Sequence, residues 1–335
     1  MRQPSTVPLM DVFGRTRTSK TGPRPLISAI LKLLALLLSG CSTIAPMTTD
    51  PQYNFKPSQA LQVDGVSINF QASLRDNLDT VVVMVHGFGE NLESWDDIYP
   101  ALASEFSVVR LDLKGSGFSS KPAQETYSPV DQAKVLLGFI KSMGLRRVVL
   151  VGHSLGGAIC LISYLQNLDA KSDLSIVGLV LVDAAVYAQR FPFFISALRN
   201  PITRFFSGLL PAESRVRLVL DYAMEVKSQI TPKKVQSYSY FLKLPGAEFA
   251  LAQTAKYIVP KNGANIAARF PEVKVPTLII WGKDDKVIPL ENGYRLHAAI
   301  AASEMIVLPE TGHVPNEERP KEVIKLVKQF LAKVR

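Results

Sequence analysis

Short apolar runs alternate with helical patterns along most of the chain. Six of these runs are bounded by polar residues: Val81–Val85, Val108–Leu111, Val148–Val151, Ile176–Val182, Thr277–Trp281 and Met305–Leu308. They are rich in β-branched residues and lack the apolar–polar alternation of a half-exposed sheet. They therefore predict strands that are buried on both faces, as in a parallel sheet.

Stretches with helical periodicity separate the predicted strands. Ser128 and Pro129 predict the start of one helix, because serine caps helix N-termini and proline suits the first helical position. Gly144 predicts the end of that helix. After Pro320, apolar residues recur at helical spacing: Val323, Val327, Phe330 and Val334. The alternation predicts a mostly parallel, doubly wound α/β sheet, with its ligand site at the carboxyl ends of the strands.

One segment interrupts this alternation. Residues 186–262 show no convincing strand, and six prolines divide their helical pieces. The segment holds 12 of the chain's 28 aromatic residues, which favours a folded insertion over a linker. We therefore expect a helical cap over 186–262, inserted into a core formed by residues 61–185 and 263–335.

The strongest chemical signal is a serine between glycines. The motif Gly152-His153-Ser154-Leu155-Gly156 lies directly between the predicted strand Val148–Val151 and a helical run. A serine on such a sharp turn projects its hydroxyl away from the sheet, and the glycines are needed because strand and helix approach closely. The motif predicts that Ser154 is a nucleophile, which requires a base near neutral pH.

Histidine is the expected base, and the chain has four. His313 follows the last predicted strand, in a loop that can reach back over the serine, and is the best candidate. His153 adjoins Ser154 and should point elsewhere. His297 lies in a helical stretch, and His86 follows the first predicted strand.

An acid must orient that histidine and stabilise its charged form. Asp183, Asp284 and Asp285 all follow predicted strands and precede His313. Their positions after strands and their order along the chain do not distinguish which of the three is the acid. Three carboxylates therefore remain candidates for the third member of the site.

Taken together, the motifs resemble the α/β-hydrolase superfamily, in particular its capped serine esterases, lipases and carbon–carbon hydrolases. The resemblance extends from about Leu61 to the C-terminus and implies an α/β-hydrolase fold with a helical cap insertion. Five motifs carry it: His86-Gly87-Phe88-Gly89, Asp112-Leu113-Lys114-Gly115-Ser116-Gly117, the turn at Ser154, Trp281-Gly282-Lys283-Asp284-Asp285, and Gly312-His313 with Glu318 and Pro320.

The resemblance also implies roles for individual residues. The family's W-G-x-x-D pattern makes Asp285 the acid, and Asp183 is the alternative because some relatives carry the acid after the preceding strand. Backbone N–H groups of Phe88 and Leu155 would form an oxyanion hole, while His86 would shape its loop. We expect no cofactor and no metal.

Three functions fit such a site, and the first is favoured. A serine hydrolase would cleave carboxylic esters of small molecules or lipids through an acyl-enzyme on Ser154. The same three residues serve carbon–carbon bond hydrolases of the ring-fission-product type. A non-catalytic, tethered binding module that keeps the fold is the third. Serine at this turn argues against epoxide opening and dehalogenation, for which relatives use aspartate.

The first 40 residues predict an export signal. Six Lys and Arg residues against one Asp give them a charge of +5, and the apolar run Leu26–Leu38 follows. The run ends in Leu38-Ser39-Gly40-Cys41, which resembles the lipobox of bacterial lipoproteins. We therefore expect lipidation of Cys41, a polar tether over 41–60, and export to a membrane-anchored position on the periplasmic side or cell surface. An uncleaved anchor, or a chance cysteine after a hydrophobic helix, is the alternative.

The net charge of +9 on 335 residues raises nucleic acid as a partner, but its distribution argues against one. The leader carries +5, the cap +7 and the remaining core −3, and neither basic region has a nucleic-acid motif. The basic, aromatic cap either faces anionic lipid or is an ordinary solvated surface. The expected partners are a small-molecule or lipid ester and a membrane. The sequence does not indicate an oligomeric state.

Overall fold

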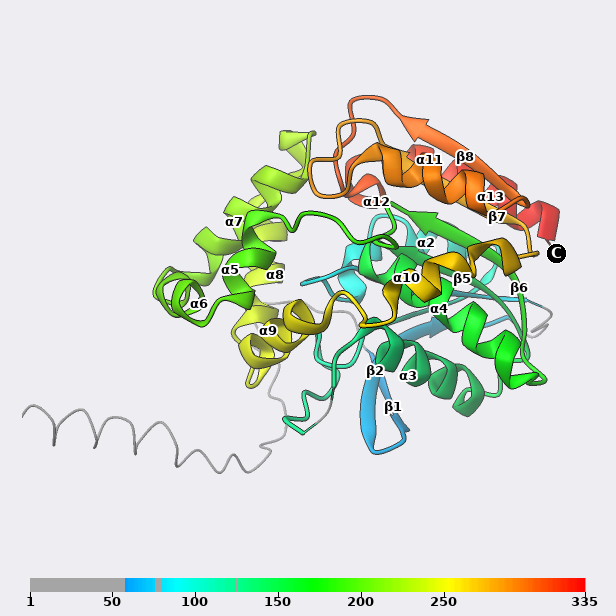
Figure 1. The fold of residues 1–335 in the computed structure, drawn as a ribbon, viewed down its shortest axis with the longest axis horizontal. Coiled ribbons are helices and arrows are strands. Elements are labelled where there is room, and N and C mark those ends of the chain that lie inside the picture. The colour runs from blue at the N-terminus through cyan, green and yellow to red at the C-terminus, as the bar shows by residue number, and fades with distance from the viewer. Residues whose placement is uncertain (1–57, 76–79, 125, 335) are drawn as a thin grey trace, which may run out of the picture. The chain divides into compact units, whose positions relative to one another are not determined.

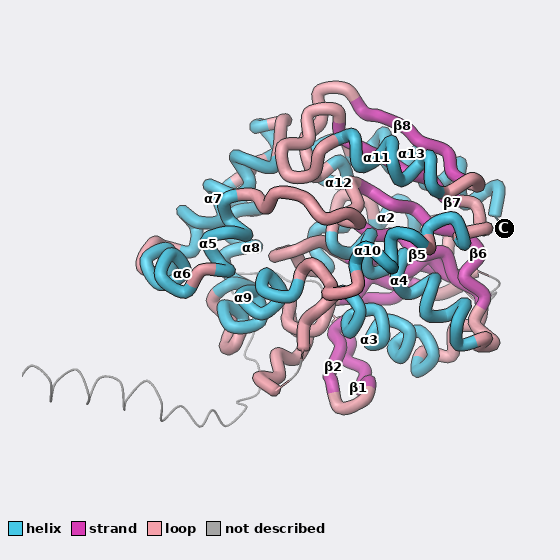
Figure 2. Tube along the Cα trace, in the orientation of Figure 1, coloured by secondary structure: helices cyan, strands magenta, loops and turns pink. Residues whose placement is uncertain are grey.

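A computed structural model describes residues 58–75, 80–124 and 126–334 of the protein. Its sheet has the strand order β1-β2-β4-β3-β5-β6-β7-β8 (Figure 1, Figure 2). β2 pairs antiparallel with β1 and β4, and every other pairing is parallel. The strands are β1 (Gln59–Val63), β2 (Val66–Ser73), β3 (Val81–Val85), β4 (Ser107–Leu111), β5 (Arg147–His153), β6 (Ser175–Val182), β7 (Thr277–Gly282) and β8 (Ser303–Leu308).

All six strands predicted from apolar runs are present, as β3 to β8. β3, β5, β6 and β7 lie inside the sheet, and nearly all of their residues are buried. Continuous apolar runs are what strands covered on both faces require. The predicted fold class, a mostly parallel, doubly wound sheet, is confirmed.

The first two strands were not predicted. β1 and β2 form a hairpin whose turn, Asp64-Gly65, has φ of 47° and 83°. Two positive φ values suit a two-residue turn that matches the twist of the strands, and Asp-Gly is a preferred pair for it. The alternating Val66, Ile68 and Phe70 after that pair were the available signal. The first strand of the sheet thus begins at Gln59, two residues before the predicted start of the core at residue 61.

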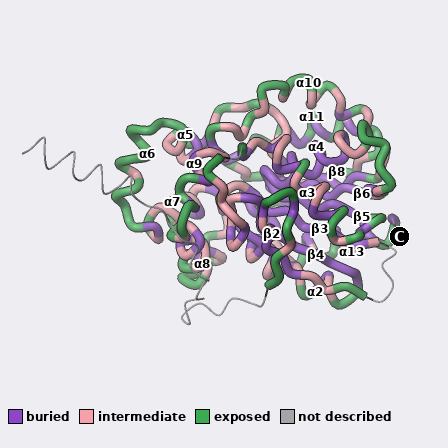
Figure 3. Tube along the Cα trace, turned by 90° about the horizontal axis from the view of Figure 1, so that it is seen from below, coloured by how far each residue is buried: buried purple, intermediate pink, exposed green. Residues whose placement is uncertain are grey.

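Helices cover both faces of the sheet. One face packs against α3 (Pro129–Ser142), α4 (Leu155–Ala170) and α11 (Leu290–Ala299). The other packs against α2 (Tyr99–Ala103) and α13 (Pro320–Val334). Figure 3 shows the result, with buried residues along the strands and exposed residues on the outer helices.

The predicted start and end of α3 are confirmed. The Ser128 side chain accepts a hydrogen bond from the Asp131 N–H, and Pro129 is the first helical residue. Gly144, with φ of 70°, follows the last turn.

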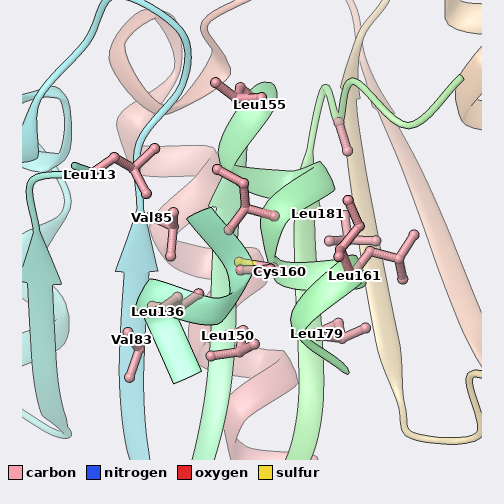
Figure 4. Packing of buried hydrophobic residues seen from close by; sticks show 14 of the residues in the cluster. Val83, Val85, Leu113, Leu136, Leu150, Leu155, Cys160, Leu161, Leu179 and Leu181 are labelled. Atoms are coloured by element: carbon pink, nitrogen blue, oxygen red, sulfur yellow. The ribbon is translucent and has the colours of Figure 1, made fainter. Parts of the chain in front are cut away.

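Beneath α4 the core is an aliphatic cluster. Figure 4 shows Cys160 of α4 among Val85 of β3, Leu150 of β5 and Leu181 of β6. Burial raises the pKa of the Cys160 thiol, so this side chain stays protonated and acts as a small apolar residue.

The cap is helical, as predicted, and lies to one side of the sheet (Figure 1). Its prolines begin helices: Pro201 and Pro232 take first helical positions, after the capping residues Asn200 and Thr231. The chain then returns to the sheet through α10 (Gly263–Ala268) and a 3₁₀ turn, η3 (Phe270–Glu272). The cap helices are α5 (Phe193–Arg199), α6 (Pro201–Gly208), α7 (Ala212–Ala223), the 3₁₀ turn η2 (Lys227–Gln229), α8 (Pro232–Leu242) and α9 (Ala247–Tyr257).

Residues 1–57 lie outside the described part of the chain. The export signal over 1–40, the lipidation of Cys41 and most of the tether over 41–60 therefore stay predictions. Within the described ranges, no helix combines the length and the apolar character needed to cross a bilayer.

Candidate active site

Ser154 lies on the turn between β5 and α4, with φ of 50° and ψ of −115°. This conformation is strained for a residue with a side chain, so the surrounding packing must hold it. A Cβ on Gly156 would lie 2.2 Å from the carbonyl oxygen of Val85, and one on Gly152 would lie 2.5 Å from that of Gly156. The glycines therefore allow the close approach of α4 to the strands, as the motif predicted.

Ser154, His313 and Asp285 form one hydrogen-bonded line. His313 Nε2 lies 3.0 Å from Ser154 Oγ, and His313 Nδ1 lies 2.8 Å from Asp285 Oδ2. An ionised carboxylate only accepts hydrogen bonds, so Nδ1–H donates to Asp285 and Nε2 accepts from the Ser154 hydroxyl. The Asp285 side chain is fully buried, and that of His313 is 8% exposed. The fold thus brings together the three residues expected from the sequence.

Backbone groups hold both partners of the serine in place. Asp285 Oδ1 accepts the N–H groups of Val287 and Ile288 at 2.7 and 2.9 Å, so its Oδ2 is the oxygen left for the imidazole. The His313 N–H donates to the carbonyl of Ala223 in the cap at 2.8 Å. The imidazole is therefore positioned by the loop after β7 on one side and by the cap on the other.

Asp183, the alternative acid, lies beside Asp285 but makes no hydrogen bond to His313. It is buried, and its Oδ1 accepts the N–H of Gly282 at 2.9 Å. Burial and the negative charge of Asp285 raise the pKa of Asp183 well above its usual range. The surroundings of Asp183 therefore favour its protonated form. Asp284, the third candidate, is exposed.

The hydrogen bonds of the same cluster leave little room for a metal ion. Asp183, Asp285 and His313 are the one group of three potential ligands among the described residues, with ligand atoms within 4.8 Å of one another. The Asp285 oxygens are already taken by two N–H groups and by the imidazole. A cation would have to displace the Nδ1 proton that holds the histidine against Asp285. The donor set therefore fits proton transfer better than metal binding.

His86 supports the loop after β3. The Leu113 N–H donates to His86 Nε2 at 3.0 Å, so the His86 Nδ1–H donates to the carbonyl of Gly87 at 2.8 Å. Burial lowers the pKa of His86 and keeps the ring neutral. His86 therefore supports the loop that follows β3, which is the role implied by the family resemblance.

His153 pairs with Glu90, a residue that sequence reasoning missed. His153 Nδ1 lies 2.9 Å from Glu90 Oε1, which is within ion-pair distance, although the two atoms are not aligned for a hydrogen bond. On the other side of the ring, Nε2–H donates to the carbonyl oxygen of His313 at 2.7 Å. Glu90 Oε2 accepts the Gly87 N–H at 2.8 Å. Against desolvation, His153 lowers the pKa of Glu90 to about 2 and Glu90 raises the pKa of His153. A carboxylate directly after His86-Gly87-Phe88-Gly89 was the available signal.

The backbone N–H groups of Phe88 and Leu155 lie near the serine and have no hydrogen-bond partner in the described part of the chain. Phe88, in the loop held by Glu90, and Leu155, the first residue of α4, both line the cavity at Ser154. The Leu155 N–H belongs to the first helical turn, whose donors lack intrahelical acceptors.

A cavity of about 310 Å³ between core and cap reaches Ser154 and His313. Phe194 of the cap stacks on Phe88, with ring centroids 6.5 Å apart. Arg215 is the only lysine or arginine among the described lining residues, and it pairs with Glu248 at 2.6 Å. The cap contributes mainly apolar side chains, among them Phe191, Phe193, Leu198, Val216, Leu220, Phe241 and Leu251.

Glu318 connects the His313 loop to the cap. It ends the short helix α12 (Pro315–Glu318). Its Oε2 accepts the N–H groups of Glu225 and Val226, in the cap, at 2.7 and 2.8 Å, and that of Gly312 at 3.1 Å. Its Oε1 accepts the N–H of Val314 at 3.2 Å. One buried carboxylate thus holds both flanks of His313 and a turn of the cap.

Glu317 makes the neighbouring connection. It is buried and contacts Lys234 and Tyr238 of α8. The cap is therefore anchored through charged and polar groups at the same loop that carries His313.

Fold, site and sequence define the class. The family model described as "alpha/beta hydrolase fold" matches residues 80–320, and the chain belongs to this family of hydrolases.

Relatives of this chain have several described activities. It is similar to the uncharacterized hydrolase YugF of Bacillus subtilis, 28% identical over 82% of this chain and 98% of the relative. The 2-hydroxy-6-oxo-2,4-heptadienoate hydrolase of Pseudomonas putida is 28% identical, over 75% of this chain and 88% of the relative. The monoacylglycerol lipase abhd6-A of Xenopus laevis is 25% identical, over 75% of each chain.

Proposed function

We propose that the protein is a serine hydrolase that cleaves carboxylic esters through an acyl-enzyme intermediate. The observation that carries the proposal is the hydrogen-bonded line from Asp285 through His313 to Ser154, which ends at an apolar cavity. Ser154 Oγ attacks the ester carbonyl carbon while His313 Nε2 takes the hydroxyl proton. Asp285 keeps the proton on Nδ1 and stabilises the imidazolium that forms.

The unpaired N–H groups of Phe88 and Leu155 stabilise the oxyanion of the tetrahedral intermediate. Loss of one such donor typically costs ~2.7–4 kcal/mol of transition-state stabilisation. His313 then returns its proton to the leaving alcohol, which leaves the acyl group on Ser154. Water, deprotonated by His313, attacks that acyl-enzyme and releases the acid. These steps need no cofactor.

The cavity favours a neutral ester over the carbon–carbon alternative. A dienoate hydrolase and a monoacylglycerol lipase are similarly distant relatives, so similarity does not choose between them. A dienoate carries a carboxylate, and burying that charge requires a cationic partner. Among the described lining residues, the one arginine, Arg215, is already paired with Glu248, and most of the lining is apolar. An acyl chain fits that lining without a charged partner.

The non-catalytic module has less support. A binding module would not need a strained serine, an aligned imidazole and a buried carboxylate in one line. All three are present and connected.

Hydrolysis of p-nitrophenyl butyrate by the full chain tests the proposal. Ser154→Ala should lower kcat by about 10⁴-fold or more, because the nucleophile is lost. Ser163→Ala is the matched control, since Ser163 is buried on the same helix but does not line the cavity. A fluorophosphonate probe should label the wild type and the control only. Full activity in Ser154→Ala, or faster turnover of a dienone acid than of the ester, would contradict the proposal.

We also propose that the chain is exported and lipidated at Cys41, so that it meets its substrate at a membrane. The support is the basic start, the apolar run Leu26–Leu38 and the Leu-Ser-Gly-Cys sequence. Metabolic labelling with a palmitate analogue in a bacterial host should mark the wild type and not Cys41→Ser. Equal labelling of both, or of neither, would contradict lipidation at this cysteine.

A further inference from the structure

The outer side of the cap carries apolar side chains that the fold leaves exposed. α6 has no buried residue, as Figure 3 shows along its length. Phe205 and Phe206 are 66% and 62% exposed, and their rings contact each other edge to face. We define the outer cap face by its exposed members: Ile202, Phe205, Phe206, Leu209, Leu210 and Leu218.

The spacing of five of these residues groups them on one stretch of the cap. Ile202, Phe205 and Phe206 stand at positions i, i+3 and i+4 of α6, which form one stripe along a helix, and Leu209 and Leu210 follow directly after its last residue, Gly208. Such a stripe ordinarily packs against a core. In α6 the stripe of Ile202, Phe205 and Phe206 is exposed instead, so it is available to another surface.

The charge around the outer cap face is positive. Residues 191–212, which include α5 and α6, contain no aspartate or glutamate, and their two arginines, Arg199 and Arg204, are exposed. Neither forms an ion pair with a carboxylate within the described ranges. Apolar side chains among uncompensated arginines complement an anionic interface.

The outer cap face also continues into the cavity. Leu210 and Leu218 are exposed members of this face, and both line the cavity that reaches Ser154. An apolar path therefore runs from the surface of the cap to the nucleophile. A lipid chain can follow such a path, whereas a folded protein partner cannot.

We propose that the outer cap face docks on an anionic lipid bilayer. Phe205 and Phe206 insert at the level of the acyl chains, and Arg199 and Arg204 contact the headgroups. A second copy of the chain is a poor occupant, because it would bring the same cap charge of +7 against this one. The docking proposal depends only on the properties of the outer cap face. Delivery of a lipid ester to Ser154 depends in addition on the proposed function.

A tryptophan placed in the face gives a direct test on the full chain. The two native tryptophans, Trp95 and Trp281, are fully buried, so a new one dominates any change in emission. The Phe205→Trp variant should shift to the blue on phosphatidylcholine vesicles that contain phosphatidylglycerol, and acyl chains carrying bromine should quench it. The shift should weaken with salt and without phosphatidylglycerol. Leu168→Trp, at an exposed position of α4, should not respond.

This reporter separates docking of the face from binding through residues 1–57. An unquenched Phe205→Trp variant on protein that floats with the vesicles would overturn the proposal. So would a blue shift that grows with protein concentration in the absence of lipid, because it would identify a second copy as the occupant. Equal quenching on neutral and anionic vesicles would overturn the role of the arginines.

A second measurement links docking to turnover. The double variant Phe205→Ser/Phe206→Ser should hydrolyse an ester embedded in anionic vesicles about tenfold more slowly, since two phenyl rings then no longer leave water on docking. Hydrolysis of soluble p-nitrophenyl butyrate should not change, because neither ring lines the cavity. Leu74→Ser/Leu168→Ser, at two exposed leucines of the core, is the matched control. Equal rates of wild type and double variant on vesicles would overturn delivery. A wild type inactive on both esters would refute the proposed function, and the fluorescence would still decide docking.

Discussion

Exchanging a carboxylate of the site for an amide separates the roles of Asp285 and Asp183. In Asp285→Asn, the amide oxygen can still accept the N–H groups of Val287 and Ile288, which hold Oδ1 at 2.7 and 2.9 Å. The amide nitrogen, a donor, then faces His313 Nδ1 in place of Oδ2. Nδ1 must accept, so the proton moves to Nε2, and the imidazole no longer takes the proton of the serine hydroxyl.

The expected loss follows from this change of tautomer. An amide in place of the orienting carboxylate lowers kcat by about 10⁴-fold in a site of this geometry, which is ~5 kcal/mol at 1.36 kcal/mol per factor of ten. Asp183→Asn exchanges a carboxyl group whose surroundings favour the protonated form for a neutral amide of the same shape, and its oxygen still accepts the Gly282 N–H. Its kcat should stay within about tenfold of the wild type.

The assay is kcat and KM for p-nitrophenyl butyrate, with active enzyme counted by fluorophosphonate titration. Comparable losses in Asp183→Asn and Asp285→Asn would refute the assignment of different protonation states. So would an Asp285→Asn variant that keeps most of its activity. The raised pKa of Asp183 adds a test of stability: as pH rises through that pKa, the wild type loses free energy of unfolding, and Asp183→Asn should lose less.

Three further substitutions test the groups around the site. Glu90→Gln should cost on the order of 3 kcal/mol of unfolding free energy in urea, most between about pH 4.5 and 6.5. The pKa of Glu90 is lowered to about 2, so its contribution to the free energy of unfolding is lost as the pH falls toward that value. The pKa of His153 is raised, so its contribution is lost as the pH rises through that pKa. A loss of stability in Glu90→Gln that does not depend on pH would contradict this ion pair. Glu318→Gln leaves one oxygen for four N–H donors and should cost about 2–4 kcal/mol in thermal unfolding, whereas an unchanged midpoint would contradict the connection. Gly156→Ala should cost about 3 kcal/mol or prevent folding, while Gly208→Ala, with open space around it, should be neutral or stabilising.

Much of the fold and the position of the nucleophile could be predicted because they depend on neighbours in sequence. Strands buried on both faces must be continuously apolar, so the runs at β3 to β7 show most of the sheet directly, whereas β8, predicted as a buried strand, is a partly buried strand at the sheet edge. The turn at Ser154 needs glycines at fixed offsets, because α4 and the strands approach within contact distance there. The hairpin of β1 and β2 also depends on neighbours in sequence, namely the turn residues Asp64 and Gly65, but the apolar runs alone do not predict it.

The remaining features of the site depend on contacts between distant segments. The residues by themselves left Asp183, Asp284 and Asp285 equivalent, and family resemblance alone pointed to Asp285. In the structure Asp285 faces His313, Asp284 is exposed, and burial beside another carboxylate favours the protonated form of Asp183. Protonation depends on the dielectric and the charges around a group, which no local pattern contains.

The cap shows the same division. Its sequence alone determined a helical, basic and aromatic insertion between the two parts of the core. Ile202, Phe205 and Phe206 have the spacing of a helix that packs inward, and only the tertiary structure decided that they are exposed. Helical periodicity states which residues share a face, but the packing of the neighbouring helices decides whether that face is buried.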